Sequence, residues 1–286
     1  MNKKLLGSVI AFLCVFAWGL TFVSTKVLLK YLNEVEILFL RVVIAYITMW
    51  IIYPKKLKFE SVKKELCFFI SGLTGICLYY IFENVALGFT YASNVSIIVA
   101  TSPLFIIIAF KLLNLNDEKL TMNYYIGFAV AIGGIIIMSG YSLNFKGDIL
   151  ALLSSIMWAL YSVFMKFCLT TKAHIVQITR RVFFYGIITV GCCSLLFFDF
   201  KIGNEIFEPV VFLNIVFLSI IASAFAFIAW NIAIKLLGAT ASAAFIYLNP
   251  VVTVVASYFL LDEPISSVSI LGTALVLVGL YLSEKK

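Results

Sequence analysis

Ten long apolar runs divide this chain, and they constrain its fold more than any single motif does. Each run is continuous rather than alternating, and each is long enough to cross about 30 Å of hydrocarbon as a helix. The connections between them are short. The runs cover residues 5–29, 35–53, 66–88, 92–113, 123–140, 148–168, 175–198, 210–236, 239–260 and 267–283.

The composition also indicates that the chain lies in a lipid bilayer. Of the 286 residues, 63% are hydrophobic and 12% are charged, and the mean hydropathy is +1.11. Soluble domains carry about 25% charged residues, so one aqueous core cannot hide this much apolar surface. We therefore predict an all-α membrane protein with ten transmembrane helices. The first apolar run continues past Trp18 without a small-residue cleavage site, which favours a first span over a removed leader.

The basic residues predict the orientation. Fourteen lysines lie on the side of the N-terminus and four on the opposite side, and three arginines lie within spans. Because positively charged loops stay inside, both termini are expected in the cytoplasm and the protein in the cell (plasma) membrane. The net charge of +7 follows from these clusters between spans, and it does not indicate nucleic acid binding. The four opposite lysines are Lys26, Lys30, Lys146 and Lys201.

The two halves of the chain repeat one another. Segment 84–103 matches segment 231–250, with an Asn and a Pro nineteen residues apart in each. Rare residues kept in the same order indicate an internal duplication, here with halves 1–140 and 141–286. Three further pairs share one offset of 140 residues, and they are Trp18 with Trp158, Lys26 with Lys166, and Arg41 with Arg181.

Each half holds five spans, which is an odd number. The two copies must therefore cross the membrane in opposite senses, as the inverted repeats of secondary transporters do. In such proteins the substrate site lies near the membrane midplane, between the halves. Two similar, inverted packings can exchange conformations and so open alternately to each side.

Several motifs resemble the EamA-type repeat of the drug/metabolite transporter superfamily. The first half carries WGLTFVSTK, LRVV, TSPLF, LNDEKL and GFAVAIGGIIIM, and the second carries LNPVVTVVASYFLLDEPIS and GTALVLVGLYL. The resemblance covers nearly the whole chain. It implies ten helices in two EamA domains, and transport of small metabolites or amino acids, often outward. Glu83 departs from the pattern, since that span is usually apolar or small there.

Two prolines, Pro103 and Pro250, lie within matched spans. A proline inside a helix removes a backbone hydrogen bond, so the carbonyls of Val99 and Ile246 are expected to lack their usual partner. We interpret this symmetric pair as kinks that line the substrate path, although a bend needed only for packing would look the same. Polar residues beside the kinks or on neighbouring spans could contact a ligand or bond a neighbouring helix; they are Thr101, Ser102, Asn249, Asn84 and Asn231.

Glu83 is the one acidic residue well inside an apolar run. A charge at membrane depth costs on the order of 2.5–3.5 kcal/mol on insertion scales, so it persists for a reason. We hypothesise that Glu83 takes up a proton coupled to transport or holds the amino group of a substrate. The alternative is an acid that snorkels outward or pairs with Lys26 or Arg41.

Charged and aromatic residues complete the candidate path. Lys26, Arg41, Lys166 and Arg181 could form matched gates or attract anionic substrates at the two mouths, or simply snorkel to headgroups. Trp18 and Trp158 lie too deep for the interfacial aromatic belt, so with other rings they could offer flat surfaces to an amphipathic ligand or merely pack helices. The other rings are Tyr79, Tyr80, Tyr161, Trp230 and Tyr247.

The remaining features argue against an enzyme. The six cysteines show no CxxC spacing, and the single histidine, His174, lies in a short polar connection. Without HExxH or GxSxG there is little to build a catalytic or metal site with, so no cofactor and no metal are expected. We predict a secondary carrier for a small molecule. The alternatives are an uncoupled facilitator of the same fold and, from another class, a structural or receptor-like membrane protein.

Overall fold

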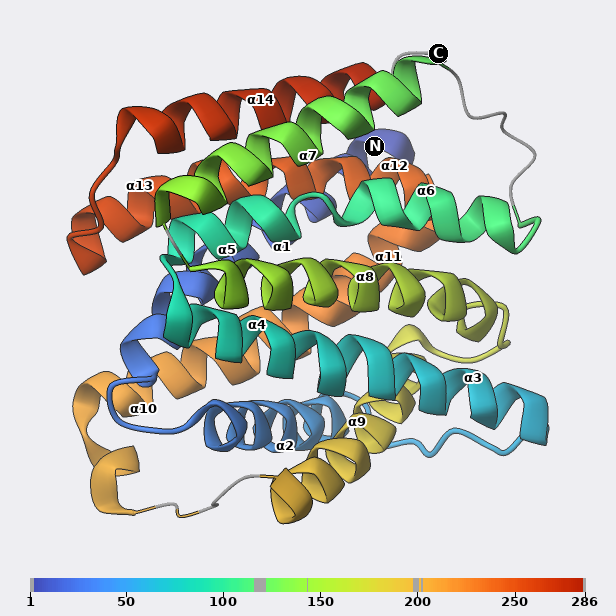
Figure 1. Cartoon of the computed structure of the whole chain (residues 1–286). Coiled ribbons are helices and arrows are strands. Elements are labelled where there is room, and N and C mark those ends of the chain that lie inside the picture. Colours follow the sequence, from blue (N-terminus) through green and yellow to red (C-terminus); the bar gives the residue numbers. More distant parts are fainter. Residues whose placement is uncertain (1–2, 116–121, 143, 198–200, 202, 285–286) are drawn as a thin grey trace.

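A computed structural model of the chain describes residues 3–115, 122–142, 144–197, 201 and 203–284 (Figure 1). All regular structure in these residues is helical. Four of the spans that the sequence gives as single runs are divided into consecutive helices. The helices of one span continue in the same direction. The first five spans are α1 (Lys3–Leu28), α2 (Glu34–Ile52), α3 (Val62–Gly72) with η1 (Leu73–Leu78) and α4 (Tyr79–Phe89), α5 (Ala92–Val99) with α6 (Ser102–Leu112), and α7 (Met122–Ser142).

The second five spans follow in the same order. A short 3₁₀ turn, η2 (Asn204–Phe207), precedes the third of them. The spans are α8 (Phe145–Cys168), α9 (Ile175–Phe197), α10 (Pro209–Val216) with η3 (Phe217–Phe225) and α11 (Ala226–Leu237), α12 (Ala239–Ala243) with η4 (Ala244–Leu248) and α13 (Asn249–Leu261), and α14 (Ser267–Glu284).

The helices have the length and the surface of membrane spans. Among the described residues, 8 helical stretches are long and apolar enough to cross a bilayer, and two shorter apolar ones lie in α7 and α14. Large apolar side chains on the outer faces stay exposed, for example Ile51 at 77% and Leu195 at 87%. Such a surface is stable in lipid and not in water. The predicted fold of ten helices in two repeats is therefore confirmed, and the protein is a multi-pass membrane protein.

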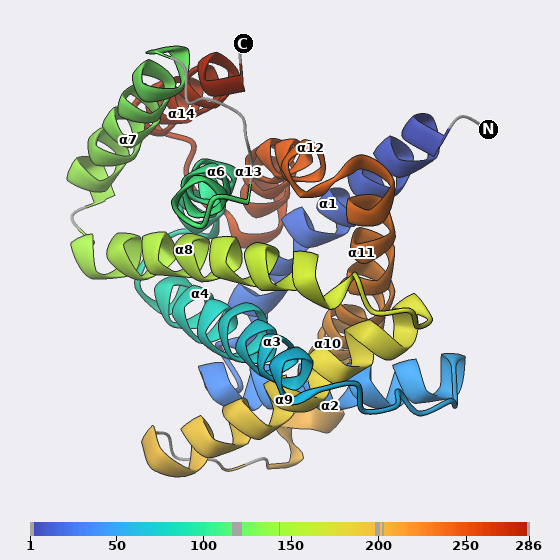
Figure 2. The ribbon, with the colours of Figure 1, turned by 90° about the vertical axis from the view of Figure 1, so that its right-hand side faces the viewer.

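The first helix of each repeat crosses into the other repeat. Helix α1 packs against α11 and α13, and its counterpart α8 packs against α4 and α6. The two outer helices, α7 and α14, lie side by side (Figures 1 and 2). This reciprocal exchange places the core of the molecule at the boundary between the repeats, where the first helices and the third and fourth spans meet.

Glycines allow α7 and α14 to approach closely. A Cβ added at Gly134 would lie 2.7 Å from the Gly272 carbonyl oxygen, and one added at Gly279 would lie 2.5 Å from the Gly127 carbonyl oxygen. No side chain fits at either position without moving backbone. These four glycines therefore permit close helix contact, which is the small-residue packing that membrane helices use.

The two proline-containing spans are broken rather than kinked. Helix α5 ends at Val99, and α6 begins at Ser102 with Pro103 in its first turn. In the second repeat the tight 3₁₀ segment η4 leads into α13, with Pro250 in the first turn. Proline is well tolerated there because its missing N–H would have no partner in the helix. The prediction of one bent helix in each repeat is thus corrected to consecutive helical segments, two in the first repeat and three in the second.

The third span of each repeat contains a π-helical segment. Segments η1 and η3 widen the helix to i→i+5 hydrogen bonding. Residues of the two repeats can be matched at the offset of 147 that relates Asn84 to Asn231. At this offset, η1 corresponds to the last six residues of η3. Insertions of this kind occur mostly at functional sites. Both widened segments face the boundary between the repeats.

Candidate functional site

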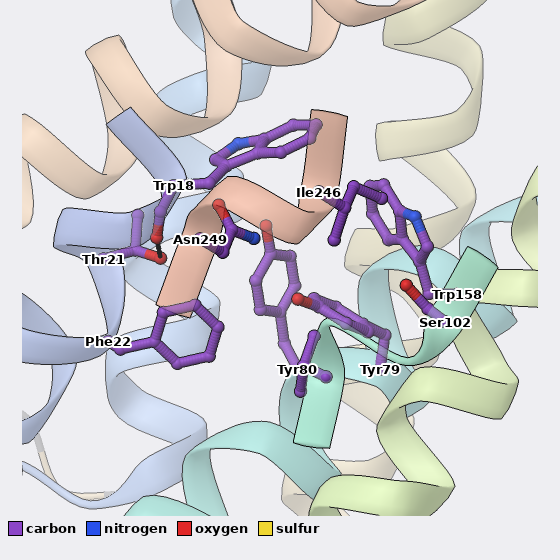
Figure 3. Close-up of a pocket in the computed structure, with 10 residues that line it drawn as sticks. Trp18, Thr21, Phe22, Tyr79, Tyr80, Ser102, Trp158, Ile246 and Asn249 are labelled. Atoms are coloured by element: carbon purple, nitrogen blue, oxygen red, sulfur yellow. Dashed lines mark hydrogen bonds between the residues drawn. The ribbon is translucent and has the colours of Figure 1, made fainter. Parts of the chain in front are cut away.

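A small cavity lies where the broken spans meet the first helices (Figure 3). Its volume of about 20 Å³ is room for roughly one water molecule. Three pairs of lining residues are related by the repeat. The lining residues are Trp18, Thr21, Phe22, Tyr79, Tyr80, Val99, Ser102, Trp158, Ile246 and Asn249, and the related pairs are Trp18 with Trp158, Val99 with Ile246, and Ser102 with Asn249.

The two matched tryptophans meet at this cavity. The ring centroids of Trp18 and Trp158 lie 5.4 Å apart with planes at 82°, an edge-to-face arrangement. Trp230 joins them at 5.0 Å from Trp18. Trp18 donates its indole N–H to the Ala222 carbonyl oxygen at 2.9 Å, in the π-helical segment η3. Residues that lie 140 positions apart in the sequence thus form one aromatic cluster.

Several buried polar atoms around the cavity have no hydrogen-bond partner among the described residues. The indole nitrogens of Trp158 and Trp230 donate to nothing there, and Ser102 Oγ and Asn249 Oδ1 accept or donate nothing. An unpaired polar atom in a water-free interior costs about 1–3 kcal/mol. Such atoms gathered at one place from both repeats call for a ligand or water to satisfy them.

Arg41 is buried beside the cavity and does not lie at a mouth. Its Nε donates to Ser223 Oγ at 2.6 Å and its Nη2 donates to the Tyr80 hydroxyl at 2.9 Å. The guanidinium carbon also lies 4.0 Å from the centre of the Tyr80 ring. At 1% exposure, Arg41 cannot snorkel to the headgroups. It fixes Tyr80, which lines the cavity.

Glu83 lies one turn beyond Tyr79. It is as buried as Arg41, at 1% exposure. Neither carboxylate oxygen accepts a hydrogen bond from the described chain within ordinary geometry. Its polar neighbours include the Tyr79 hydroxyl and the Arg41 guanidinium. The alternative of an acid that snorkels outward does not fit this burial, and Lys26 pairs elsewhere.

Lys26 lies at the end of the bundle away from the N-terminus and links the two repeats there. Its Nζ lies 3.7 Å from Glu263 Oε1 and donates to the Thr90 carbonyl oxygen. Glu263 also accepts hydrogen bonds from the backbone N–H groups of Ala92 and Ser93, at 2.7 and 3.2 Å. A carboxylate at the start of a helix satisfies donors that the helix itself cannot. These contacts join α1 and the start of α5 in the first repeat to the connection between α13 and α14 in the second.

The matched cations have different surroundings. Lys166 donates to the Leu115 carbonyl oxygen at 2.9 Å and lies over the Phe110 ring. Arg181 pairs with Glu65 at 3.3 Å, close to the end of the membrane-spanning region. The residues of the LNDEKL motif that would correspond to Glu263 and its neighbours, 116–121, lie outside the described residues.

The two asparagines bind neighbouring helices. Asn84 Nδ2 donates to the Glu34 carbonyl oxygen at 2.9 Å, and Asn231 Nδ2 donates to Thr179 Oγ1 at 2.9 Å. In addition, the Tyr161 hydroxyl lies 3.4 Å from Asn231 Oδ1. Neither Asn lines the cavity, so the helix-bonding interpretation of these two residues fits their contacts. The remaining predicted residues, Thr101, Pro103, Tyr247 and Pro250, lie next to the lining residues in the broken spans but do not line the cavity.

Sequence reasoning missed four cavity residues and one residue that links the two repeats. Thr21, Phe22, Val99 and Ile246 line the cavity, and Glu263 joins the ends of the two repeats. Val99 and Ile246 had a usable signal, since they are paired by the repeat and precede the matched prolines. Glu263 lies in the LDEP turn, but its hydrogen bonds reach 171 residues back in the chain. No local pattern specifies such a partner.

Comparison with known proteins gives the family. A model of the EamA-like transporter family matches residues 5–140 and 145–284. Two uncharacterized transporters of Archaeoglobus fulgidus are 26% and 27% identical, covering 100% and 96% of this chain and 99% and 97% of their own. A transporter of Bacillus subtilis, YvbV, is 25% identical over 100% of this chain and 93% of its own.

A solved structure supports the fold independently. It superposes with a TM-score of 0.69 at 18% identity and covers 97% of this chain and 96% of its own. At that identity the likeness concerns the fold alone. The family match, in contrast, extends over both repeats and almost every residue. The chain therefore belongs to the EamA-like transporter family and is a membrane transporter.

Proposed function

We propose that this transporter is a secondary carrier, which exports a small amphipathic metabolite such as an amino acid across the cell membrane by alternating access. The observation that carries the proposal is the central cavity, which is lined by three repeat-related pairs and surrounded by unpaired buried polar atoms from both repeats. A site shared in this way between inverted halves is what a carrier needs, because exchange of the two packings reverses its access. The division into halves 1–140 and 141–286 is part of this proposal.

The geometry of the cavity supports alternating access over an open pore. A volume of about 20 Å³ is too small for a metabolite, so substrate can be held only if the lining helices move apart. The breaks before Pro103 and Pro250 supply points where the spans can bend without disrupting long helices. The Lys26–Glu263 contacts would then hold one end closed while the other end opens.

The groups at the site suit a ligand with both charges and an apolar part. Arg41 and the indole N–H groups of Trp158 and Trp230 can donate to a carboxylate. Glu83 can accept from an ammonium group or bind a proton. Tryptophan and tyrosine rings provide the apolar surface between them. This combination favours an amino acid or a similar zwitterion.

The orientation and the coupling complete the proposal. The lysine distribution supports an orientation in the cell membrane with both termini on the cytoplasmic side. Export in exchange for protons would use the Glu83 carboxylate as the shared site, occupied either by a proton or by the amino group of the substrate. In the second candidate, an uncoupled facilitator, Arg41 would neutralise Glu83 permanently, as their electrostatic interaction allows.

Flux measurements test these alternatives. Purified protein is reconstituted in liposomes, a mixture of labelled amino acids is offered, and a gradient of one pH unit is imposed. A carrier that exchanges one proton for one substrate accumulates substrate up to about tenfold, because a factor of ten corresponds to ~1.4 kcal/mol. Equilibration without accumulation would support the facilitator, and absence of protein-dependent flux for any amino acid would contradict the proposed substrate class.

A further inference from the structure

A second pocket lies between α2 and α9, at the end of the bundle where α2 ends and α9 begins. Its volume is about 430 Å³, and it shares no lining residue with the central cavity. The light-blue connection that follows α2 in Figure 1 forms one of its walls. Its size suits a ligand rather than a packing defect.

The wall that follows α2 is fixed to α9 by side-chain hydrogen bonds. Arg180 Nη1 donates to the Tyr53 carbonyl oxygen at 2.6 Å, and Gln177 Nε2 donates to the Lys56 carbonyl oxygen at 2.8 Å. Arg181 Nη2 adds a third contact to the Leu57 carbonyl oxygen at 3.3 Å. Three side chains on consecutive turns of one helix therefore hold the backbone of residues 53–57, and the pocket is preformed.

The pocket is strongly basic. Lys56, Arg180 and Arg181 line it, and none of the described lining residues carries a carboxylate. Glu65 compensates Arg181 from outside the pocket at 3.3 Å, but the Arg181 Nε is buried and donates no hydrogen bond within the described chain. Two or more positive charges without matching negative ones create a site that attracts an anion.

The rest of the pocket is aromatic and leads to the lipid-facing surface. The Arg180 guanidinium lies 3.5 Å from the centre of the Trp50 ring, and Tyr46 lies 6.4 Å from both Trp50 and Phe184. On the same turns of α2 and one turn further along α9, large apolar side chains are exposed. They are Ile47, Ile51 and Ile188. The pocket thus has a basic end near the membrane surface and an apolar side along the helices.

We propose that this pocket binds an anionic phospholipid of the leaflet on the N-terminal side. The headgroup phosphate lies among Lys56, Arg180 and Arg181, and an acyl chain follows the aromatic wall onto the exposed face of α2 and α9. Basic pockets between helices at this depth select anionic headgroups. A free phosphate ester would use the same cations but would leave the aromatic wall unused. The proposal does not depend on which substrate the central cavity takes.

Tryptophan fluorescence offers a direct test. Three of the four tryptophans are buried at the centre, at 7%, 4% and 1% exposure, and Trp50 alone lies half-buried at the pocket. Brominated lipids quench indole fluorescence on contact, so the quenching reports lipid that is bound next to Trp50. The full-length protein is titrated in mixed micelles with brominated phosphatidylglycerol and, separately, with brominated phosphatidylcholine. We expect saturable quenching by the anionic lipid at a lower mole fraction, and loss of the quenched signal in Trp50→Phe.

Charge variants identify the binding residues. Each basic residue near a headgroup is worth about a fivefold change in affinity, or ~1 kcal/mol, so Lys56→Gln should weaken anionic binding about fivefold and Lys56→Gln/Arg181→Gln about 30-fold. The side chain of Lys56 is exposed, and its backbone contact to Gln177 is kept, so the single variant should fold. The matched control is Lys58→Gln/Lys63→Gln, which removes one exposed charge from the same connection and one from the first turn of α3, both outside the pocket.

Three outcomes would overturn the proposal. Equal quenching by the two lipids in the unmodified protein would show that the pocket does not select charge. An equal loss in the control variant would indicate diffuse surface attraction instead of a site. Displacement of the brominated lipid by millimolar inorganic phosphate would assign the pocket to a soluble phosphate compound. Retained preference in the control, with loss in the Lys56 and Lys56/Arg181 variants and no displacement by phosphate, supports the lipid site.

Discussion

The third spans of the two repeats occupy equivalent positions but carry different chemistry. Both contain π-helical turns, and both keep an Asn that bonds a neighbouring helix. However, three positions of the first repeat's third span, two of which line the cavity, carry polar side chains, while the second repeat has apolar or indole side chains at the matched positions. The pairs are Tyr79 with Ala226, Tyr80 with Phe227, and Glu83 with Trp230.

This difference separates what the duplication preserves from what it has changed. The helix breaks, the widened turns and the Asn contacts build the scaffold, and they occur twice. The acid, its hydroxyl neighbours and the buried Arg41 occur on one side only, so the two repeats differ in the polar groups that they bring close to the cavity. A symmetric fold thereby holds an asymmetric site, which suits a ligand with two unlike ends.

The largest difference in stability is expected between variants of the two matched arginines. Arg41 is buried and holds Ser223 and Tyr80, whereas Arg181 is partly exposed beside Glu65. Arg41→Gln removes the charged donor from these two buried partners, and it should destabilise the protein by about 1.5–3 kcal/mol. Arg181→Gln should cost about 1 kcal/mol or less. Thermal unfolding in detergent measures both, and equal losses would show that the repeats use their arginines alike.

The contact between α7 and α14 should show the next largest effect. A Cβ at Gly134 would meet the Gly272 carbonyl oxygen, while one at Gly133 would meet nothing within 4 Å. Gly134→Ala should therefore destabilise the protein by about 1–3 kcal/mol through overpacking. Gly133→Ala, one residue away, should be neutral or stabilising by up to about 1 kcal/mol because Ala is the better helix former. Comparable unfolding temperatures for the two variants would argue against a tight helix contact.

We expect Glu83 to couple transport to the proton gradient, and we expect movement of the substrate itself not to require it. Glu83→Gln keeps the shape but removes the group that can exchange a proton, so accumulation driven by one pH unit should fall from about tenfold to equilibration. Exchange of labelled for unlabelled substrate at equal pH should persist. The control is Glu60→Gln, an exposed acid in the connection before α3. Full accumulation by the Glu83 variant would remove this residue from the coupling mechanism.

The sequence predicts the scaffold better than the site. Run lengths specify the spans because each span must cross a fixed thickness of hydrocarbon, and the pairing of Trp18 with Trp158 predicts the inverted repeat. The broken helices were not predicted, since a proline inside a run is compatible with a bend as well as a break. The contact of Glu263 with the start of α5 was also missed. It depends on packing between segments that are 171 residues apart, which no local periodicity encodes.

The smallest effect concerns the paired tryptophans, and it tests the asymmetry most finely. Trp18 donates to the Ala222 carbonyl oxygen at 2.9 Å, but the N–H of Trp158 has no acceptor in the described chain. The counterpart of Ala222 is Gly75, and the Tyr161 ring packs directly against it. Replacement by Phe removes one ring and the N–H in either case, so the packing loss is similar and the difference isolates the hydrogen bond.

Trp18→Phe should therefore unfold at a lower temperature than Trp158→Phe, by the equivalent of about 0.6–1.5 kcal/mol. The two substitutions should rank in the opposite order in their effect on substrate affinity. If the free N–H of Trp158 is kept for a ligand, Trp158→Phe loses affinity while Trp18→Phe, whose N–H is already used by the protein, keeps it. Thermal shifts with and without the transported compound measure both quantities on the same samples. Equal effects of the two substitutions on stability and on binding would mean that the tryptophans act symmetrically, and that the polarity of the site comes from the third spans alone.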